Sequence, residues 1–493
     1  MPLPSILASL TDLSYGFRCL RVKEPTVGLT TAAAQTLLPP IEGSGGRAEL
    51  VAERLGEAIR MGLLLDGERL PSEPQLAAQL GVSIMTLREA LATLREQGLV
   101  STRPGRGGGS FVRAPADRGE PLQRFSVHEL RDLGDQRAAI SGAAARLAAE
   151  RALPEEVQKL EEQVERLQTA ASPSERRRAD TQLTIGVAGA AQSPRLTREE
   201  ARLRAEVGDL LGLDLEEPDH QAAVRARRQL VEAIAKRKPD RARELAERQV
   251  SAETQRLIRL RLELPRAGTP ADESLAGVAQ ELDSVLGALG ELGDRFRELA
   301  GKRLRSDDLE ALRPAIFELL TEHSGLVTGA GVITTPGLLA DRPHWLEWWW
   351  TRNGGVPEAL RVNLDPTAPD FYDYTTADWY ATPKETSEPR MAGPYVDYFC
   401  TNQYTITLSR PVYAGDRMLG VAAADVLVAS LEKRVLPALT ALGRPAALTS
   451  ADGRVIASTS ESVIPGQRLT LSDRAARRAG SRSPIGSWLL VDV

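Results

Sequence analysis

The sequence predicts a multidomain α+β chain in which a winged helix-turn-helix, an all-α helical bundle and an antiparallel sheet flanked by helices follow one another. Three observations lead to this prediction. Residues 70–112 contain two short helical patterns joined by a glycine turn, then two strand segments around a glycine-rich tip. Helical patterns rich in Ala, Leu, Arg and Glu continue to about residue 264. Beyond residue 327, Trp, Tyr, Phe, Thr and Val cluster in alternating segments between Gly, Asp and Pro turns.

The length of 493 residues is too great for a single hydrophobic core and indicates about three domains. We expect the winged helix at 47–115, a polar linker at 116–126, the bundle at 127–268 and the sheet domain at 273–493. Residues 1–46 carry Pro and Gly with little periodicity, so we expect either a disordered extension there or a start site assigned too early.

Charge and cysteine content narrow the class of protein. A net charge of -5 excludes a wholly basic coat for nucleic acid but allows one basic module on an acidic body. Cys19 and Cys400 lie too far apart in the chain to indicate a disulfide framework or a zinc cluster. Apolar runs stay below membrane-spanning length, and the first residues lack the basic start of a secretion signal. We therefore expect a cytoplasmic protein with no membrane partner.

The helix-turn-helix is predicted from its capping residues. Ser72 and Gln75 form a capping box that starts the first helix, Gly81 ends it, and Ser83 caps the second. Along the second helix, helical spacing separates a buried stripe, made by Leu87, Leu91 and Leu94, from a solvated face with Thr86, Arg88, Glu89 and Arg95. That solvated face suits a major groove. The hairpin that follows holds Arg103 and Arg106 on glycine-rich backbone that can approach phosphates closely.

The segments "LPSE", "LGVS", "TLREAL", "GLV" and "GRGG.FV" make this region resemble the DNA-binding domain of the GntR family of bacterial transcription regulators. The resemblance implies a double-stranded DNA operator as partner. It implies contacts from Ser72, Ser83, Thr86, Arg88, Arg103, Arg106 and Gly107. Two positions that hold Arg in the family carry Pro74 and Ile84 here, so Arg88, Arg103 and Arg106 would do more of the contact work. The alternative is a small helical subdomain with a charged exterior.

The helical region resembles the effector domain, of FCD type, in the FadR-type branch of that family, through "LRDLGDQRAAISGAAARLAAERAL" and "RRQLVEAIAKRKPDRARELAERQV". Such domains often hold a metal with an Asp and three His. Here Asp180 falls on the Asp position, but Thr184, Arg227 and Gln249 fall on His positions, and His220 lies off the pattern. We expect a dimerising bundle without metal or other cofactor. Asp180 and Arg227 form a buried ion pair in one interpretation and lie on the solvated surface in the other.

The last part of the chain begins with an apolar stripe from Leu275 to about Gly301, typical of a coiled coil or of a helix packed on a sheet. Strands are predicted at 327–333, 404–412, 420–426, 446–449 and 454–457. The phrases "DWYATP", "GPYVDYFCTNQYTITLSRPVYAGDRMLGVAAADV" and "PALTSADGRVIAST" resemble a Cache domain, a PAS-like small-molecule sensor with an antiparallel sheet and flanking helices.

The Cache resemblance implies a ligand pocket on one side of the sheet. The residues that match it are Tyr372, Trp379, Tyr380, Tyr395, Asp397 and Asp425. Aromatic faces and carboxylates suit a cation, and the Arg that clamps a ligand carboxylate in amino-acid-binding members is replaced by Ala377. We therefore expect an amine as effector, unless Arg390 supplies a clamp from another loop. The tryptophans at 345 and 348–350 are expected to pack between helix and sheet.

Three functions remain open. The first is a dimeric, ligand-responsive, non-enzymatic transcription regulator. The second is a fusion of the winged helix with an aminotransferase-like enzyme that uses pyridoxal phosphate, for which Lys302, Lys384 and Lys433 are the downstream lysines. The third is a sensor that no longer binds DNA, which Pro74 and Ile84 favour.

Overall fold

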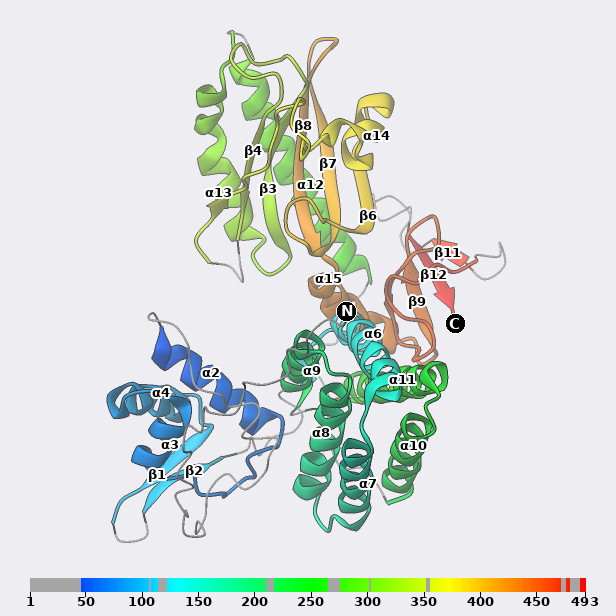
Figure 1. Ribbon diagram of the computed structural model, residues 1–493. Coiled ribbons are helices and arrows are strands. Elements are labelled where there is room, and N and C mark those ends of the chain that lie inside the picture. Colours follow the sequence, from blue (N-terminus) through cyan, green and yellow to red (C-terminus); the bar gives the residue numbers. More distant parts are fainter. Residues whose placement is uncertain are drawn as a thin grey trace, which may run out of the picture.

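The computed structural model describes residues 46–105, 108–113, 122–208, 210, 217–264, 275–300, 303–351, 355–470, 476–478 and 488–493. Three groups of elements lie side by side: the winged helix, the helical bundle and the sheet domain (Figure 1). The predicted extension at 1–45, residues 116–121 of the predicted linker, and Arg106 and Gly107 of the hairpin tip lie outside the described residues. No helix within the described ranges combines the length and apolarity needed to cross a bilayer.

The winged helix is a compact unit of helices and one hairpin. Its elements are α2 (Arg47–Arg60), α3 (Glu73–Leu80), α4 (Ile84–Glu96), β1 (Val100–Arg103) and β2 (Gly109–Val112). The predicted caps are present: Ser72 and Gln75 form the capping box, and Gly81 ends α3 with a left-handed φ of 67°. Ser83 Oγ accepts a hydrogen bond from the Thr86 N–H at 3.1 Å, which starts α4. Leu87, Leu91 and Leu94 are buried as their spacing predicts.

The described part of the bundle consists of six helices. They are α6 (Val127–Arg151), α7 (Pro154–Thr169), α8 (Pro173–Ala190), α9 (Pro194–Val207), α10 (Glu217–Ala235) and α11 (Pro239–Glu263). Capping boxes from Ser126 and Ser172 start α6 and α8, and proline stands at the start of α7, α8, α9 and α11, where its missing N–H costs nothing. The prolines therefore delimit the helices, as the punctuation of the sequence indicates.

The described strands of the sheet domain form two antiparallel sheets. Its helical elements are α12 (Leu275–Leu299), η1 (Ser306–Leu312), α13 (Arg313–Glu322), η2 (Tyr374–Thr376), α14 (Asp378–Thr386) and α15 (Val428–Thr440). Its strands are β3 (Val327–Thr334), β4 (Leu346–Trp350), β5 (Glu358–Ala359), β6 (Arg390–Val396), β7 (Tyr404–Ala414), β8 (Arg417–Leu427), β9 (Ala446–Thr449), β10 (Val455–Ser458), β11 (Ala476–Arg478) and β12 (Leu489–Asp492). The larger sheet has the order β5-β4-β3-β8-β7-β6, and the smaller has the order β10-β9-β12-β11.

The two faces of the larger sheet bury different side chains. Successive strand residues point to opposite faces, so Ala422 and Ala424 of β8 join the core that contains α12, while Val421 and Ala423 join an aromatic cluster. The stripe that begins at Leu275 therefore packs on the sheet, and the coiled-coil interpretation is wrong for this helix. Asp425 shares the phase of Val421 and Ala423, which places it on the aromatic face.

Candidate functional site

The solvated face of α4 is the predicted DNA-reading surface. Arg88 projects from it with 64% of its side chain exposed, and its Nε donates to Glu73 Oε2 of α3 at 2.7 Å. Ser72 and Ser83 lie at the starts of α3 and α4, where their hydroxyls are engaged in the helix caps. Arg88 is thus an exposed cation of this face, and a carboxylate restrains it.

The hairpin supplies a second cationic group beside α4. The guanidinium of Arg103 lies over the Phe111 ring at 4.6 Å from its centroid, an arrangement that orients the charge without neutralising it. Arg69 Nη2 donates to the Gly108 carbonyl at 2.5 Å and ties the hairpin to the loop before α3. Sequence reasoning missed Arg69 because its partner is 39 residues away.

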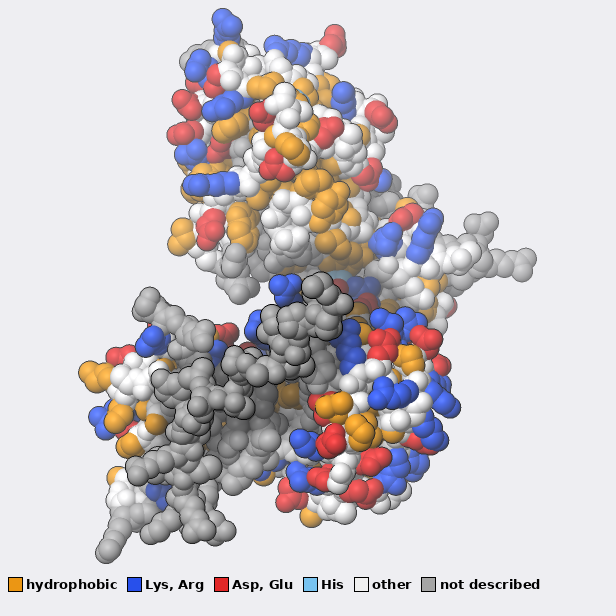
Figure 2. Space-filling view, in the orientation of Figure 1, with side chains coloured by type: hydrophobic (Ala, Val, Ile, Leu, Met, Phe, Trp, Pro, Cys, Tyr) orange, Lys and Arg blue, Asp and Glu red, His pale blue; other side chains and the backbone are white. Residues whose placement is uncertain are grey.

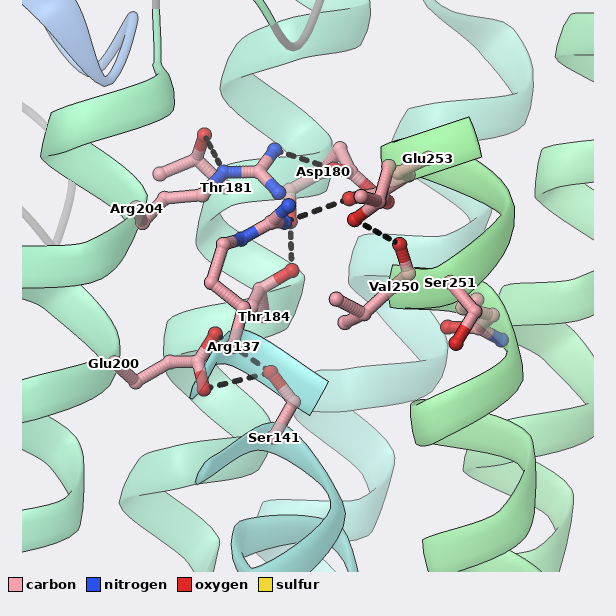
Figure 3. A network of polar contacts seen from close by, with 12 residues as sticks. Arg137, Ser141, Asp180, Thr181, Thr184, Glu200, Arg204, Val250, Ser251 and Glu253 are labelled. Carbon is pink, nitrogen blue, oxygen red and sulfur yellow. Dashed lines mark hydrogen bonds and ion pairs between the residues drawn. The ribbon is translucent and has the colours of Figure 1, made fainter. Parts of the chain in front are cut away.

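A polar network occupies the middle of the bundle. Figure 3 shows Arg204 of α9 directed at Asp180 of α8, with Glu253 of α11 close by. Arg227 Nε donates to Asp180 Oδ1 at 2.7 Å, its Nη2 donates to Glu253 Oε1 at 2.8 Å, and its Nη1 donates to Gln249 Oε1 at 2.6 Å. Of the two placements open from sequence, the structure shows the buried ion pair.

The network's charges fix the protonation of its acids. Burial alone would raise the pKa of Asp180, but the guanidiniums of Arg227 and Arg204 outweigh it and hold that pKa well below its usual range. Arg137 and Arg227 likewise outweigh burial at Glu253 and lower its pKa. Both carboxylates are therefore ionised at neutral pH and are paired with cations.

These residues do not fit a metal ion. Two guanidiniums already occupy the side of Asp180 where a cation would sit, and the Thr184 hydroxyl donates to the Asp180 carbonyl at 2.9 Å. Among the described residues, no three His, Cys, Asp or Glu side chains gather as a metal site would require. Arg227 and Arg204 supply the positive charge that a metal would otherwise bring.

A cavity of about 370 Å³ opens beside this network. Its wall includes Asp180, Arg227, Gln249 and His220. His220 therefore lies near the network, although it does not fall on a His position of the family pattern. His220 is 3% exposed. Neither its Nε2 nor the Nε2 of Gln249 has a hydrogen-bond partner within the described chain. The cavity therefore has a wall that includes ionised and polar side chains.

The same helix that carries Asp180 also holds the winged helix. Thr181 Oγ1 donates to the Met61 carbonyl at 2.9 Å, and Arg178 Nη2 donates to the Leu63 carbonyl at 2.6 Å. Arg178 also pairs with Glu68 at 3.0 Å. These contacts join α8 to the segment after α2 and were not readable from sequence, because the partners are more than 100 residues apart.

The sensor pocket lies on the aromatic face of the larger sheet. Its lining includes five of the six predicted ligand residues, Tyr372, Trp379, Tyr395, Asp397 and Asp425, together with Trp348, Cys400 and Thr407. The cavity holds about 20 Å³, which is room for about one water molecule. A wider vestibule of about 500 Å³ shares Tyr372, Trp379, Tyr395 and Asp397 with it. A guest larger than water would have to part the shared side chains.

Asp425 is the buried acid of this pocket. Thr407 Oγ1 donates to Asp425 Oδ1 at 2.7 Å, and the Tyr395 hydroxyl lies 2.6 Å from the same Thr407 oxygen. Because the threonine proton is directed at Asp425, Tyr395 is the donor to Thr407. Burial raises the pKa of Asp425 to about 7, the Thr407 hydrogen bond opposes that rise, and Asp397 adds to it. Asp425 is thus poised to gain or lose a proton near neutrality.

Asp397 is partnered locally. Its Oδ2 accepts hydrogen bonds from the Thr401 N–H at 3.1 Å and the Thr401 hydroxyl at 2.8 Å. Burial and the nearby Asp397 raise the pKa of the Cys400 thiol, so the cysteine stays protonated. Sequence reasoning missed Cys400 and Thr407 because neither residue type marks a pocket by itself.

Two aromatic assignments change. Tyr380 is fully buried beside Tyr374 and lines neither the pocket nor the vestibule; its hydroxyl donates to Thr335 Oγ1 at 3.4 Å. Adjacent helix residues diverge by about 100°, so Trp379 and Tyr380 of α14 cannot both face one cavity. Trp348 lines the pocket, whereas Trp349 packs edge-on against Phe317 as expected for helix-to-sheet packing.

Arg390 and Ala377 lie in the vestibule. Arg390 Nε and Nη2 both donate to Asp378 Oδ2, at 3.0 and 2.8 Å. Arg390 therefore already has a carboxylate partner, and it lines the vestibule while the inner pocket is formed by other residues. No carboxylate clamp stands at Ala377.

The sensor domain meets the bundle through Glu432 of α15. This side chain is 1% exposed, and its carboxylate accepts hydrogen bonds from the N–H groups of Val127 at 2.7 Å and His128 at 3.0 Å, in the first turn of α6. The His128 ring stacks on Tyr404 of β7 at 4.3 Å between centroids. Leu436 of α15 packs in the same core cluster as Val127. Because α15 follows β8 directly, few residues separate Asp425 from this junction.

Comparisons with known proteins match this division of the chain. Family models match at 47–109 ("Bacterial regulatory proteins, gntR family"), 132–252 ("FCD domain") and 357–433 ("Methyl-accepting chemotaxis protein-like, first PDC sensor domain"). The sensory domain of the Campylobacter jejuni chemoreceptor Tlp3 aligns with a TM-score of 0.29 at 14% identity, covering 42% of this chain and 75% of that one.

Two relatives are similar to part of the chain. The HTH-type transcriptional regulator RmpR of Mycobacterium gastri is 41% identical over 216 residues, which are 42% of this chain and 77% of RmpR. An uncharacterized HTH-type transcriptional regulator of Mycobacterium tuberculosis is 35% identical over 138 residues, 27% of this chain and 56% of that relative. With the winged helix, the FCD domain and the PDC-type sensor domain in place, the chain belongs to the GntR family of bacterial regulatory proteins.

Proposed function

We propose that this GntR-family regulator binds its operator as a homodimer in the cytoplasm and changes its DNA affinity when a small molecule enters the sensor pocket. The observation that carries this proposal is the chain of buried polar contacts between domains. Glu432 of the sensor domain caps α6 of the bundle, and α8 of the bundle holds the winged helix through Thr181 and Arg178. A shift of α15 can therefore alter the presentation of α4.

The effector we propose is a small organic cation. The inner pocket gathers aromatic side chains around Asp425 and Asp397, and its wall holds no arginine or lysine. A cation gains from the ring faces of Trp348 and Trp379 and from ionised Asp425. A carboxylate would meet two acids and be repelled. The small volume favours a compact amine.

Thermal-shift measurements on the full chain test the pocket. Amines are expected to raise the melting temperature and amino acids are not, because a ligand that binds only the folded state stabilises it. Asp425→Asn should lose the response, while Asp416→Asn, an exposed change in the turn between β7 and β8, should keep it. Stabilisation by amino acids alone would overturn the charge assignment.

DNA binding is tested by in vitro selection followed by footprinting. Arg88→Ala and Arg106→Ala should each weaken binding by about 1 to 3 kcal/mol, whereas Arg146→Ala, a half-exposed arginine of the bundle, should not. Selection of no sequence by the wild-type chain would favour a sensor that no longer binds DNA. Lys384 and Lys433 are exposed on the surface, which gives the enzyme alternative no enclosed Schiff-base site among the described lysines.

The bundle cavity supports a second ligand site. Its wall brings together His220, Gln249 and Arg227, a set of residue types that suits a small anion carrying a hydroxyl group. Hydroxy acids should then stabilise the wild-type chain, and His220→Ala should abolish that effect while leaving the amine response intact. An unchanged hydroxy-acid response in His220→Ala would exclude this site.

A further inference from the structure

Two adjacent apolar side chains are exposed at the start of α4. Ile84 is 41% exposed and Met85 is 69% exposed, while Leu87 and Leu91 of the same helix are buried. At about 100° per residue, Met85 lies opposite the buried stripe, on the face that carries Arg88. Hydrophobic side chains show at the left edge of the molecule over this part of the winged helix (Figure 2).

This exposure is informative because of where it occurs. Single exposed apolar residues are ordinary on protein surfaces, but these two stand at the N-terminal end of the helix that would enter the major groove. The bases present one apolar group in that groove, the C5 methyl of thymine. The family pattern has Arg at the position of Ile84, and Arg most often reads guanine. Ile84 cannot make that contact.

We propose that Ile84 and Met85 read thymine methyl groups, so that each operator half-site carries thymines opposite the start of α4. The proposal rests on the proposed DNA binding and adds its base preference. Ile84 offers a rigid branched surface, and Met85 offers a flexible thioether chain that can adapt to a methyl group. Arg88 of the same helix and Arg103 of β1 would supply the charge that holds the helix against the phosphates.

Deoxyuridine scanning tests the methyl contact directly. A duplex is first obtained by in vitro selection with the full-length chain, and each thymine is then replaced singly by deoxyuridine, which removes only the methyl group. Wild-type affinity should fall about three- to tenfold at one or two thymines per half-site, as loss of a buried methyl group predicts. In Met85→Ala or Ile84→Ala the same replacement should cost less than about twofold, because the reading side chain is gone.

Leu153→Ala provides the matched control, since Leu153 is 58% exposed but lies in the bundle, and it should keep the wild-type scan. A flat scan in a wild-type chain that still selects DNA would overturn methyl reading and leave the regulator proposal standing. Failure to select any DNA would instead remove the proposed function. Methyl reading would also be overturned if Met85→Ala and Ile84→Ala lost as much affinity for the deoxyuridine duplex as for the thymine duplex. A changed oligomeric state of Met85→Ala in gel filtration would overturn it too.

Discussion

Asp425 is the residue on which the proposed amine selectivity rests, because its pKa lies near neutral pH. Burial raises its pKa to about 7, so about half of the Asp425 side chains are ionised at that pH. A cationic guest favours the ionised form, and its binding is therefore linked to release of a proton. The proposed selectivity for amines would thus depend on pH as well as on shape.

The first prediction follows from this linkage. Below about pH 7, amine affinity should fall by up to about tenfold per pH unit, because Asp425 must lose a proton before it can pair with the cation. Calorimetric titrations of the full chain between about pH 8 and about pH 6, with an amine that stays charged throughout, measure the effect. Asp425→Asn should bind weakly at every pH. Identical affinities across this range in the wild type would refute the assignment.

The second prediction concerns Glu73. Its ion pair with Arg88 restrains an exposed cation of the face that we propose to contact DNA. Glu73→Gln should therefore raise DNA affinity and steepen its salt dependence, since one more cation becomes available to phosphate. Electrophoretic mobility shifts over a range of salt concentrations measure this, with Glu155→Gln, an exposed change in α7, as control. A lower affinity in Glu73→Gln would show that the pair positions Arg88 instead of restraining it.

Side-chain roles were readable from sequence only where the partners are close in the chain. Ser72 with Gln75 and Ser83 with Thr86 are three residues apart, so their caps follow from local rules. Trp379 and Tyr380 belong to the same segment that resembles the Cache domain. Because adjacent helix residues point about 100° apart, Trp379 lines the pocket and Tyr380 is buried beside Tyr374. Charge and spacing alone could not decide whether Asp180 and Arg227 form a buried ion pair or lie on the solvated surface. Their burial depends on the packing of α9 and α11 around them.

At the scale of elements, the first turn of α6 depends on an acid from another domain. Its N–H groups at Val127 and His128 are buried, and Glu432 is their acceptor. Burial raises the pKa of Glu432 to about 7 despite these hydrogen bonds. Burial and the neighbouring Arg131 lower the pKa of His128 to about 4, so that ring is neutral at this junction.

The third prediction is a change of stability with pH. A raised carboxyl pKa stabilises the folded state below the unfolded value of 4.5, and this contribution, on the order of 3 kcal/mol, is lost as pH rises through about 7. Glu432→Gln keeps an acceptor but cannot titrate, so its free energy of unfolding should vary less with pH than that of the wild type. Urea titrations in an Asp425→Asn background isolate the effect, because Asp425 titrates in the same range.

Glu432→Ala removes the acceptor that Glu432→Gln keeps. It leaves two buried N–H groups without an acceptor, which should cost about 1 to 3 kcal/mol of unfolding free energy and weaken the effect of ligand on DNA affinity. A full ligand response in this variant would show that the signal takes another route.

The fourth prediction concerns the bundle network. With guanidiniums beside Asp180, the purified chain should hold no stoichiometric transition metal. Joint replacement by Thr184→His, Arg227→His and Gln249→His should create a site that binds a divalent metal, because it restores the Asp and three His of the family pattern. Elemental analysis distinguishes the two proteins. Stoichiometric zinc or nickel in the wild type would contradict the charge argument.

The positions of helices and strands were easier to predict from the sequence than the elements against which they pack. The strands at 327–333, 404–412, 420–426, 446–449 and 454–457 match β3, β7, β8, β9 and β10 within a few residues, since alternation and turn residues are local signals. The partner of the Leu275 stripe was left open from sequence, because a sheet and a second helix accept the same apolar spacing. Only the tertiary structure shows that α12 lies on the larger sheet.

At the scale of the whole molecule, the fifth prediction is a dimer on a palindrome. Two winged helices related by a two-fold axis should protect two half-sites about one helical turn apart. Footprinting and sedimentation of the complex measure spacing and stoichiometry together. One chain bound to one half-site at working concentrations would contradict this arrangement.

The position of Asp180 between Arg178 and Thr181 has a consequence for anyone who recombines these domains. One turn of α8 serves as cavity wall on one side and as dock for Met61 and Leu63 on the other. A chimera that joins a foreign winged helix to this bundle at the linker would keep the cavity. It would lose the hydrogen bonds that Thr181 and Arg178 donate to the carbonyls of Met61 and Leu63. To transmit a signal, a foreign winged helix must carry residues after its first helix that can form hydrogen bonds with Thr181 and Arg178 of α8. The segment that must be transferred together is therefore larger than the DNA-binding domain.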